Sequence, residues 1–160
     1  MADHCVYRRS VVLPATPEAV FRFHEDPHNI PKISPAFQRT IIGHANAEAR
    51  VGETFAIEVR LFGVLTLRWL GFWEEIVPGR LLVDGACQAP FAYWRHRHEF
   101  APVGAAQTRM NDQVTYRYPG GWLGYFFGAT LGRLHMALMF ADRHRRTRRY
   151  FQQQSQASPR

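Results

Sequence analysis

Two histidines on one predicted strand are the residues of this sequence best suited to chemistry in a protein interior. Side chains alternate between the two faces of a strand, so residues 94–100 divide into two sets. One set faces inward and consists of Trp94, His96, His98 and Phe100. The other set is charged and consists of Arg95, Arg97 and Glu99. Tryptophan and phenylalanine mark the buried face, so both histidines are expected to point into the interior.

A carboxylate on the following strand is expected beside these histidines. If the hairpin between the two strands is centred near Gly104, Asp112 lies opposite His96 and Met110 lies opposite His98. A buried imidazole backed by a carboxylate can be a self-satisfied polar pair that fixes the sheet register. It can also anchor a mostly apolar ligand, or act as a general acid–base near neutral pH. The sequence leaves these roles open, and no residue is assigned as catalytic.

The same three side chains are of the types that zinc prefers. Histidines at positions i and i+2 of a strand can reach one ion, and Asp112 would complete a three-ligand site. This spacing is also the commonest way for a strand to place two side chains on one face, so we expect neither a metal nor another cofactor. The motifs GxSxG, HExxH and GxGxxG are absent from the sequence, as is a phosphate-binding loop.

Large aromatic residues are expected on the same inner face as the histidines. Trp69, Trp73 and Trp94 would form a wall suited to a flat or apolar ligand, and Tyr116 would offer a hydroxyl group to it. The expected ligand-binding set therefore consists of Trp69, Trp73, Trp94, His96, His98, Asp112 and Tyr116.

The elements that position these residues follow from periodicity and turn signals. Residues 4–13 predict a strand, and two short helices broken by prolines follow at residues 17–24 and 28–33, with Thr16 as the first N-cap. Six further strands are expected between residues 37 and 118, because apolar and polar residues alternate there between turns. A hairpin centred on Gly63 would place Glu58 opposite Arg68.

A long helix is predicted from residue 122 to residue 151, with a length of about 45 Å. An apolar stripe at helical spacing is expected to cover the sheet, and it consists of Leu123, Phe127, Leu131, Leu134 and Leu138. Gly124, Gly128 and Gly132 form a neighbouring ridge that is expected to let the sheet approach closely. Arg133 and His135 argue against a membrane span. We expect one domain over residues 1–151 and a frayed polar tail over residues 152–160.

Composition limits the cellular context and the partners. Cys5 and Cys87 show no metal-ligand spacing, and the polar N-terminus is unlike a secretory signal, so a cytoplasmic location is expected. The net charge of +7 is concentrated at the end of the last helix, in Arg143, Arg145, Arg146, Arg148 and Arg149. This Arg143–Arg149 cluster is either a solvated helix end or a peripheral contact with an anionic membrane. No nucleic-acid motif accompanies it, and the oligomeric state is left open.

The order of elements and three local segments resemble the START-related helix-grip superfamily, including its polyketide cyclases and lipid-transfer domains. The segments are residues 21–30, the pattern Trp94-x-His96-x-His98-x-Phe100 and residues 112–121. The resemblance spans residues 6–151 and is closest to a bacterial branch described as ligand-binding or cyclase/dehydrase-like. It implies an α+β fold in which a seven-stranded curved antiparallel sheet wraps round a long C-terminal helix. It also implies a pocket near the two short helices.

The resemblance does not select one activity, because members of this superfamily transport, sense, cyclise or only bind. Our first hypothesis is a carrier or binding protein for a small hydrophobic molecule, such as a lipid, a polyketide or an aromatic compound. The alternative is a cyclase/dehydratase-like enzyme in which His96 exchanges protons and Asp112 orients it. A second alternative is a membrane-associated lipid or quinone chaperone.

Overall fold

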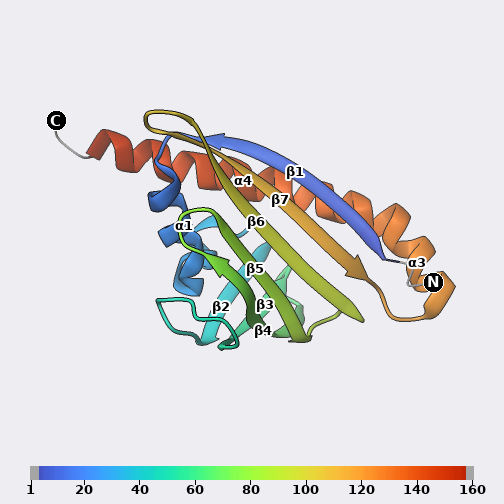
Figure 1. Ribbon diagram of the computed structural model, residues 1–160. Coiled ribbons are helices and arrows are strands. Elements are labelled where there is room, and N and C mark those ends of the chain that lie inside the picture. The colour runs from blue at the N-terminus through green and yellow to red at the C-terminus, as the bar shows by residue number, and fades with distance from the viewer. Residues whose placement is uncertain (1–3, 158–160) are drawn as a thin grey trace.

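The computed structural model describes residues 4–157, which form one curved sheet and one long helix that crosses it (Figure 1). The seven strands are β1 (Cys5–Leu13), β2 (Gln38–His44), β3 (Thr54–Leu61), β4 (Leu65–Val77), β5 (Leu81–Gln88), β6 (Tyr93–Gly104) and β7 (Gln107–Arg117). The helices after β1 are α1 (Pro17–Glu25), η1 (Pro27–Asn29) and α2 (Ile30–Ile33). The C-terminal helix comprises α3 (Gly121–Phe127), η2 (Gly128–Gly132) and α4 (Arg133–Ala157). This architecture confirms the predicted fold class.

The sheet is built from successive hairpins, and the first strand pairs with the last. Its strand order is β1-β7-β6-β5-β4-β3-β2, and all neighbouring strands are antiparallel. The β3–β4 hairpin turns at Phe62 and Gly63, which both have positive φ, and Glu58 pairs with Arg68 as predicted. Strand β1 pairs with β7, so β1 and β2, which are consecutive in the chain, are the two edge strands of the sheet. The sheet remains open between β1 and β2, where the short helices lie.

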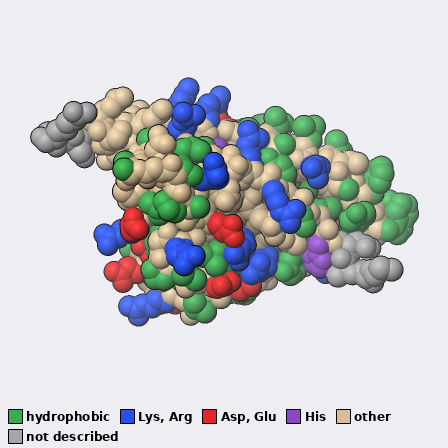
Figure 2. Space-filling view, turned by 45° about the horizontal axis from the view of Figure 1, so that its top comes forward, with side chains coloured by type: hydrophobic (Ala, Val, Ile, Leu, Met, Phe, Trp, Pro, Cys, Tyr) green, Lys and Arg blue, Asp and Glu red, His purple; other side chains and the backbone are tan. Residues whose placement is uncertain are grey.

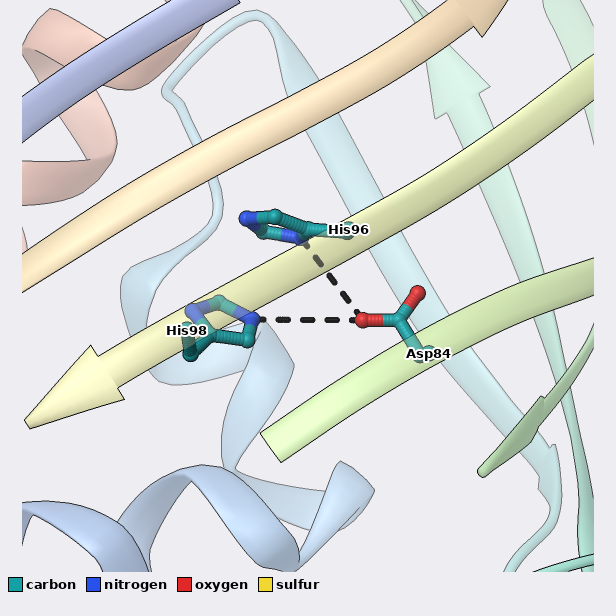
Figure 3. A group of neighbouring side chains, drawn as sticks. All are labelled: Asp84, His96 and His98. Atoms are coloured by element: carbon teal, nitrogen blue, oxygen red, sulfur yellow. Dashed lines mark ion pairs between the residues drawn. The ribbon is translucent and has the colours of Figure 1, made fainter. Parts of the chain in front are cut away.

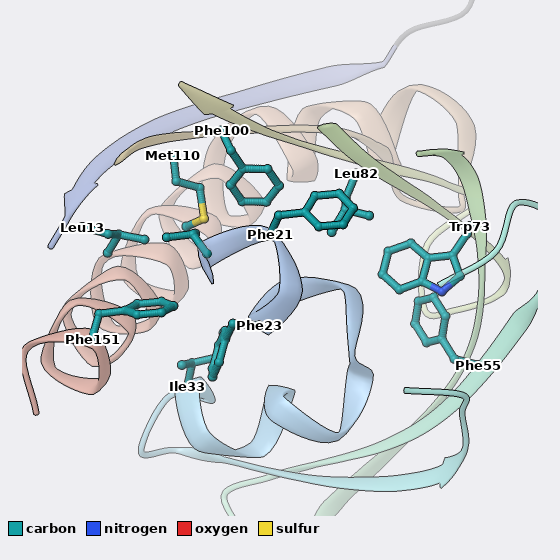
Figure 4. Close-up of a cluster of buried hydrophobic side chains, with 11 residues drawn as sticks. Leu13, Phe21, Phe23, Ile33, Phe55, Trp73, Leu82, Phe100, Met110 and Phe151 are labelled. Atoms are coloured by element: carbon teal, nitrogen blue, oxygen red, sulfur yellow. The ribbon is translucent and has the colours of Figure 1, made fainter. Parts of the chain in front are cut away.

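The short helices close the concave side of the sheet (Figures 1 and 4). The side chain of Thr16 accepts a hydrogen bond from Ala19 N, and Pro17 occupies the first turn, as the sequence predicted. Phe21 reaches Leu82 and Phe100 on the sheet, whereas other members of this cluster surround the end of α4. The buried set consists of Leu13, Val20, Phe21, Phe23, Ile33, Phe55, Trp73, Leu82, Phe100, Met110 and Phe151.

The buried stripe of the C-terminal helix is not the apolar stripe expected from the sequence. Leu123, Leu131, Leu134 and Leu138 are between 56% and 61% exposed, so the expectation that this stripe covers the sheet is wrong. The residues that are buried instead recur at intervals of three or four, and they are Gly124, Gly128, Gly132, Met136, Phe140, His144, Thr147 and Phe151. Hydrophobic periodicity identified a helix correctly but selected the wrong face.

The glycine ridge makes the close approach that the sequence predicted. A Cβ atom on Gly124 would lie 2.2 Å from the carbonyl oxygen of Pro119, and one on Gly132 would lie 2.7 Å from the ring of Tyr118. The π-helical turn η2 contains the other ridge residue, Gly128, whose carbonyl oxygen accepts a hydrogen bond from the Tyr116 hydroxyl at 2.8 Å. Gly124 therefore packs against the turn that follows β7, and Gly128 packs against Tyr116 and Cys5 of the sheet.

Two further expectations need correction. Helix α4 continues to Ala157, so the expected frayed tail is helical at residues 152–157, and residues 158–160 lie outside the described part of the chain. In the β6–β7 hairpin, Asp112 pairs with His98 and not with His96, because the turn is centred one residue later than expected. Moving the centre of the turn by one residue changes the pairing partner by two positions, so Asp112 stays on the inner face.

We expect Gly124→Ala to lower the free energy of unfolding by about 1–3 kcal/mol, because the added methyl group collides with backbone that has no free rotamer to adopt. The neighbouring Leu123→Ala variant should change this free energy by no more than about 0.5 kcal/mol, since Leu123 is 59% exposed. Urea denaturation measures both values. A larger loss in Leu123→Ala than in Gly124→Ala would contradict the assignment of the buried face.

Candidate functional site

A cavity of about 500 Å³ lies between the curved sheet and the C-terminal helix. Strands β3 and β4 supply one apolar wall, which includes Ile57, Leu67 and Trp69. Met136 and Phe140 of α4 supply the facing wall. The polar side chains that line the cavity come from α1, β2, β5, β6 and α4, and they are His24, Gln38, Asp84, His96, His98, His135 and Arg143. The cavity therefore combines a large apolar surface with a limited set of polar groups, as small-molecule sites do.

The predicted site residues divide into two groups. Trp69, Trp73, Trp94, His96 and His98 all line the cavity. The other two predicted residues, Asp112 and Tyr116, are buried behind its wall. The hydroxyl of Tyr116 is used by the π-helical turn, and the lining tyrosine is its neighbour Tyr118.

Asp112 is the centre of a buried cluster of imidazoles. Its Oδ1 atom lies 3.0 Å from Nε2 of His96 and 2.5 Å from Nδ1 of His98. Its Oδ2 atom lies 2.5 Å from Nε2 of His144, which comes from α4. Burial alone would raise the pKa of Asp112, but the contacts with these three histidines hold that pKa well below its usual range. Asp112 is therefore an ionised acceptor that ties β6 and α4 to β7.

The ionised Asp112 determines which nitrogens of the neighbouring rings carry protons. A carboxylate accepts hydrogen bonds, so we assign the proton of His96 to Nε2. Burial is the largest influence on the pKa of His96 and His98 and lowers both, although Asp112 partly opposes the shift. The rings are therefore neutral at pH 7, and the second nitrogen of each is an acceptor.

Asp84, on the neighbouring strand β5, faces both histidines (Figure 3). It pairs with His96 across the β5–β6 ladder, and its Oδ2 atom lies 3.7 Å from Nδ1 of His96 and 3.9 Å from Nε2 of His98. These distances exceed hydrogen-bonding range. The indole Nε1 of Trp94 donates to the other oxygen, Oδ1, at 3.3 Å. Burial raises the pKa of Asp84 to about 6, against the opposing effect of His98.

Two further polar groups complete the inner end of the cavity. Nδ1 of His24 donates a hydrogen bond to the carbonyl oxygen of Val20 at 2.8 Å, while its buried Nε2 has no hydrogen-bond partner among the described residues. Its ring lies 5.5 Å from that of His98. Arg143 lines the same cavity, and within residues 4–157 it forms no ion pair closer than 4.0 Å. Its charge lies near Asp112 and Asp84 and favours their ionised forms.

The sequence reasoning missed Asp84, His24, His144 and Arg143. Asp84 is the one charged residue in the buried stretch Leu81–Gly85, and His24 follows the buried residues of α1. A single polar residue within an apolar segment is the signal that could have identified both. His144 continues the helical spacing of Met136 and Phe140. Arg143 was grouped with the exposed arginines, from which it differs only by its position on the helix.

The outer surface carries an apolar region at the α3 end of the molecule (Figure 2). It is formed by Trp122, Leu123, Phe126, Leu131 and Leu134, which are between 56% and 75% exposed. Phe127 lies in the same segment and also lines the cavity. The Arg143–Arg149 cluster lies farther along the helix, and Asp142 pairs with Arg145 and Arg146 there. Within the part of the chain that the structure describes, no helix is long and apolar enough to cross a membrane.

We expect His24→Gln to weaken the dependence of stability on pH. The pKa of His24 is about 6.5 in an unfolded chain, and burial lowers it to about 3 in the folded protein. Neutral His24 thus contributes stability above pH 6.5 that is lost as the pH falls, with a slope of about 1.4 kcal/mol per pH unit. Urea denaturation between pH 4.5 and 6.5 with EDTA should show a slope smaller by about this amount in the variant.

The control for this experiment is Phe21→Leu, which removes buried apolar surface and adds no titratable group. It should lower the free energy of unfolding by a similar amount at every pH. Equal slopes in wild type and His24→Gln would show that His24 is charged, or accessible to water, in the folded protein.

Comparison with known proteins gives the fold its context. No protein-family model matches the sequence, and no curated protein matches it. Among solved structures, protein CV1439 from Chromobacterium violaceum has a TM-score of 0.73 at 19% identity, covering 91% of this chain and 96% of that chain. The Zhui aromatase/cyclase from Streptomyces sp. R1128 has a TM-score of 0.62 at 13% identity, covering 92% and 96%.

A START superfamily protein from Mycobacterium smegmatis has a TM-score of 0.57 at 17% identity, covering 85% of this chain and 95% of that chain. Identities this low establish architecture and leave activity open. The curved sheet, the short helices after β1 and the long C-terminal helix thus have direct counterparts in solved structures, and the chain has the helix-grip fold that its sequence predicted.

Proposed function

We propose that this protein binds a small, mainly hydrophobic molecule in its internal cavity and acts as a carrier or binding protein. The observation that carries the proposal is the cavity itself, whose volume of about 500 Å³ lies within the usual range for small-molecule sites. Aromatic and aliphatic side chains of β3, β4 and α4 form most of its wall. Replacing water with an apolar guest at such a surface lowers the free energy.

The polar end of the cavity gives the ligand an orientation. Arg143 and the pair His96–His98 lie there, whereas Leu65, Leu67 and Phe127 line other parts of the wall. A guest with an apolar body and one oxygen-bearing or acidic group satisfies both regions. Lipids, polyketides and aromatic compounds with such a group form the chemical class that we propose.

An enzymatic role is the second candidate. The Zhui protein is named as an aromatase/cyclase, and in this chain His96 lines the cavity with Asp112 behind it. In that role His96 would exchange protons with the bound substrate and Asp112 would fix the tautomer of its ring. Loss of turnover in His96→Gln with unchanged ligand affinity would distinguish the enzyme from the carrier.

We expect Trp69→Ala to weaken binding of a fluorescent polyene fatty acid about tenfold or more. Trp69 lines the cavity and contacts Trp94 edge to face, so its removal takes away a large part of the apolar wall. Fluorescence titration of the purified protein gives the affinity. The matched control is Trp122→Ala, which removes a tryptophan that is 75% exposed and outside the cavity.

Native mass spectrometry of protein purified from its own host provides an independent measurement. A stoichiometric hydrophobic compound released on denaturation is the expected result. A protein that is empty and also binds none of a panel of lipids, quinones and aromatic compounds would exclude the carrier function.

A membrane-associated form of this carrier is favoured by the apolar region on α3. Trp122 and Phe126 are exposed beside Phe127, which lines the cavity, so an apolar molecule leaving a bilayer would meet a continuous apolar path. Tryptophan and phenylalanine on a short helix suit the interface of a membrane. This region is a second possible contact besides the Arg143–Arg149 cluster.

We expect the double substitution Trp122→Ala and Phe126→Ala to reduce binding to anionic lipid vesicles about tenfold, through loss of buried apolar surface. Replacing Arg145, Arg146, Arg148 and Arg149 with glutamine should remove the salt-sensitive part of the binding. Vesicle sedimentation at low and high salt measures both effects. The control is Val103→Ala in the β6–β7 hairpin. Equal vesicle binding by wild type and all variants would exclude the apolar region and the arginine cluster as membrane contacts.

A further inference from the structure

Three side chains on adjacent strands bring unused acceptor atoms together at the inner end of the cavity. Nδ1 of His96, Nε2 of His98 and one carboxylate oxygen of Asp84 all lie within 4.8 Å of one another (Figure 3). All three side chains are buried and line the cavity. Lone pairs that face each other in a buried site repel, unless a proton or a cation lies between them.

Asp112 lies against the second nitrogen of each ring and accepts a hydrogen bond from that of His96. His96 Nε2 and His98 Nδ1 lie 3.0 Å and 2.5 Å from its Oδ1 atom. This arrangement matches the outer shell of metal sites, in which a carboxylate holds the far nitrogen of each ligating imidazole. Asp112 thereby holds His96 by a hydrogen bond and lies in contact with His98, and the other nitrogen of each ring faces Asp84.

The distances fit a first-row ion. Ligand atoms about 2.1 Å from a tetrahedral ion are about 3.4 Å apart. The two distances from Asp84 Oδ2, 3.7 Å to His96 and 3.9 Å to His98, exceed this value by only a few tenths of an ångström. The distance between the two imidazole nitrogens is below 4.8 Å, so the rings would turn toward each other to hold one ion.

A fourth group next to this cluster is independently unsatisfied. The buried Nε2 atom of His24 has no hydrogen-bond partner among the described residues, and His24 lines the same end of the cavity. Its ring lies beside that of His98, with 5.5 Å between the centroids. A buried nitrogen without a partner costs free energy unless another group satisfies it.

From these observations we infer that Asp84, His96 and His98 form a binding site for a divalent first-row transition metal, with Asp112 as the residue that positions both imidazoles. Two imidazoles and one carboxylate suit Zn²⁺ or Fe²⁺. An ion held there borders the apolar cavity, so its remaining coordination positions are open to an oxygen atom of a bound molecule. The site goes beyond the proposed carrier function and can exist without it.

The test uses the full-length protein after removal of metal with a chelator. Titration with Co²⁺ should produce visible absorption bands that saturate at one ion per chain, and competition with a chromophoric chelator should give the Zn²⁺ affinity. Nitrogen NMR of the histidine side chains should show Zn²⁺ at Nδ1 of His96 and Nε2 of His98, and none at His144. This spectroscopic assignment needs no variant.

Three variants then separate the roles. Asp84→Asn removes a ligand and should weaken Zn²⁺ binding more than about 100-fold, while Asp112→Asn removes only the outer partner and should weaken it about 10–100-fold. His44→Gln alters an exposed histidine of β2 outside the cavity and should leave the affinity unchanged. Circular dichroism confirms that each variant is folded, and the Asp84→Asn result decides the question if Asp112→Asn does not fold.

Absence of a saturating Co²⁺ spectrum in the wild-type protein would overturn the inference, as would equal Zn²⁺ affinity in wild type and Asp84→Asn. Binding of the polyene fatty acid to the metal-free protein is measured in parallel. Fatty-acid binding without metal binding would exclude the metal site and leave the proposed carrier function standing. Metal binding without fatty-acid binding would exclude the carrier function and leave the metal site standing.

Discussion

An ionised carboxylate removed from water must be met by hydrogen-bond donors, and in this protein three imidazoles surround that of Asp112, of which those of His96 and His144 form hydrogen bonds with it. Two of them belong to the neighbouring strand β6, and the third, His144, belongs to the C-terminal helix. The helix is therefore attached to the sheet at a defined depth by a polar contact, in addition to the apolar residues Met136 and Phe140. The hydrogen bond from the Tyr116 hydroxyl to the Gly128 carbonyl oxygen is a second polar contact between the sheet and the C-terminal helix.

The same contact gives the two buried carboxylates different environments. Asp112 is surrounded by imidazole nitrogens on its two oxygens, whereas Asp84 receives a single hydrogen bond, from Trp94. This difference explains why the pKa of Asp112 lies below its usual range and that of Asp84 is raised to about 6. His96 and His98 lie between the two carboxylates, with one nitrogen of each ring directed to each side. The buried carboxylates thus lie on β5 and β7 and leave the cavity walls supplied by β3 and β4 apolar.

The sequence predicted the fold well because its signals are local. Alternation identified the strands, Gly63 placed one hairpin, and Thr16 marked the start of α1. It predicted less of the site, because the site depends on pairings between strands. The β6–β7 turn was placed one residue early, and the pairing of Asp84 with His96 could not be inferred across the loop that contains Pro90. His144 lies in an arginine-rich stretch whose composition indicates a solvated surface, so only the tertiary structure reveals its burial.

The face that α3 and α4 present to the sheet affects how relatives of this chain should be recognised. Its buried positions begin with Gly124, Gly128 and Gly132 and continue through larger residues at the same helical spacing. The leucines that give the helix its hydrophobic pattern lie outside this stripe, where substitution is structurally permissive. During divergence, natural selection for the fold would therefore act on small residues that hydropathy comparisons largely ignore. We therefore expect distant homologues to share a glycine at every fourth position, followed by a histidine three turns later, more often than the leucine repeat.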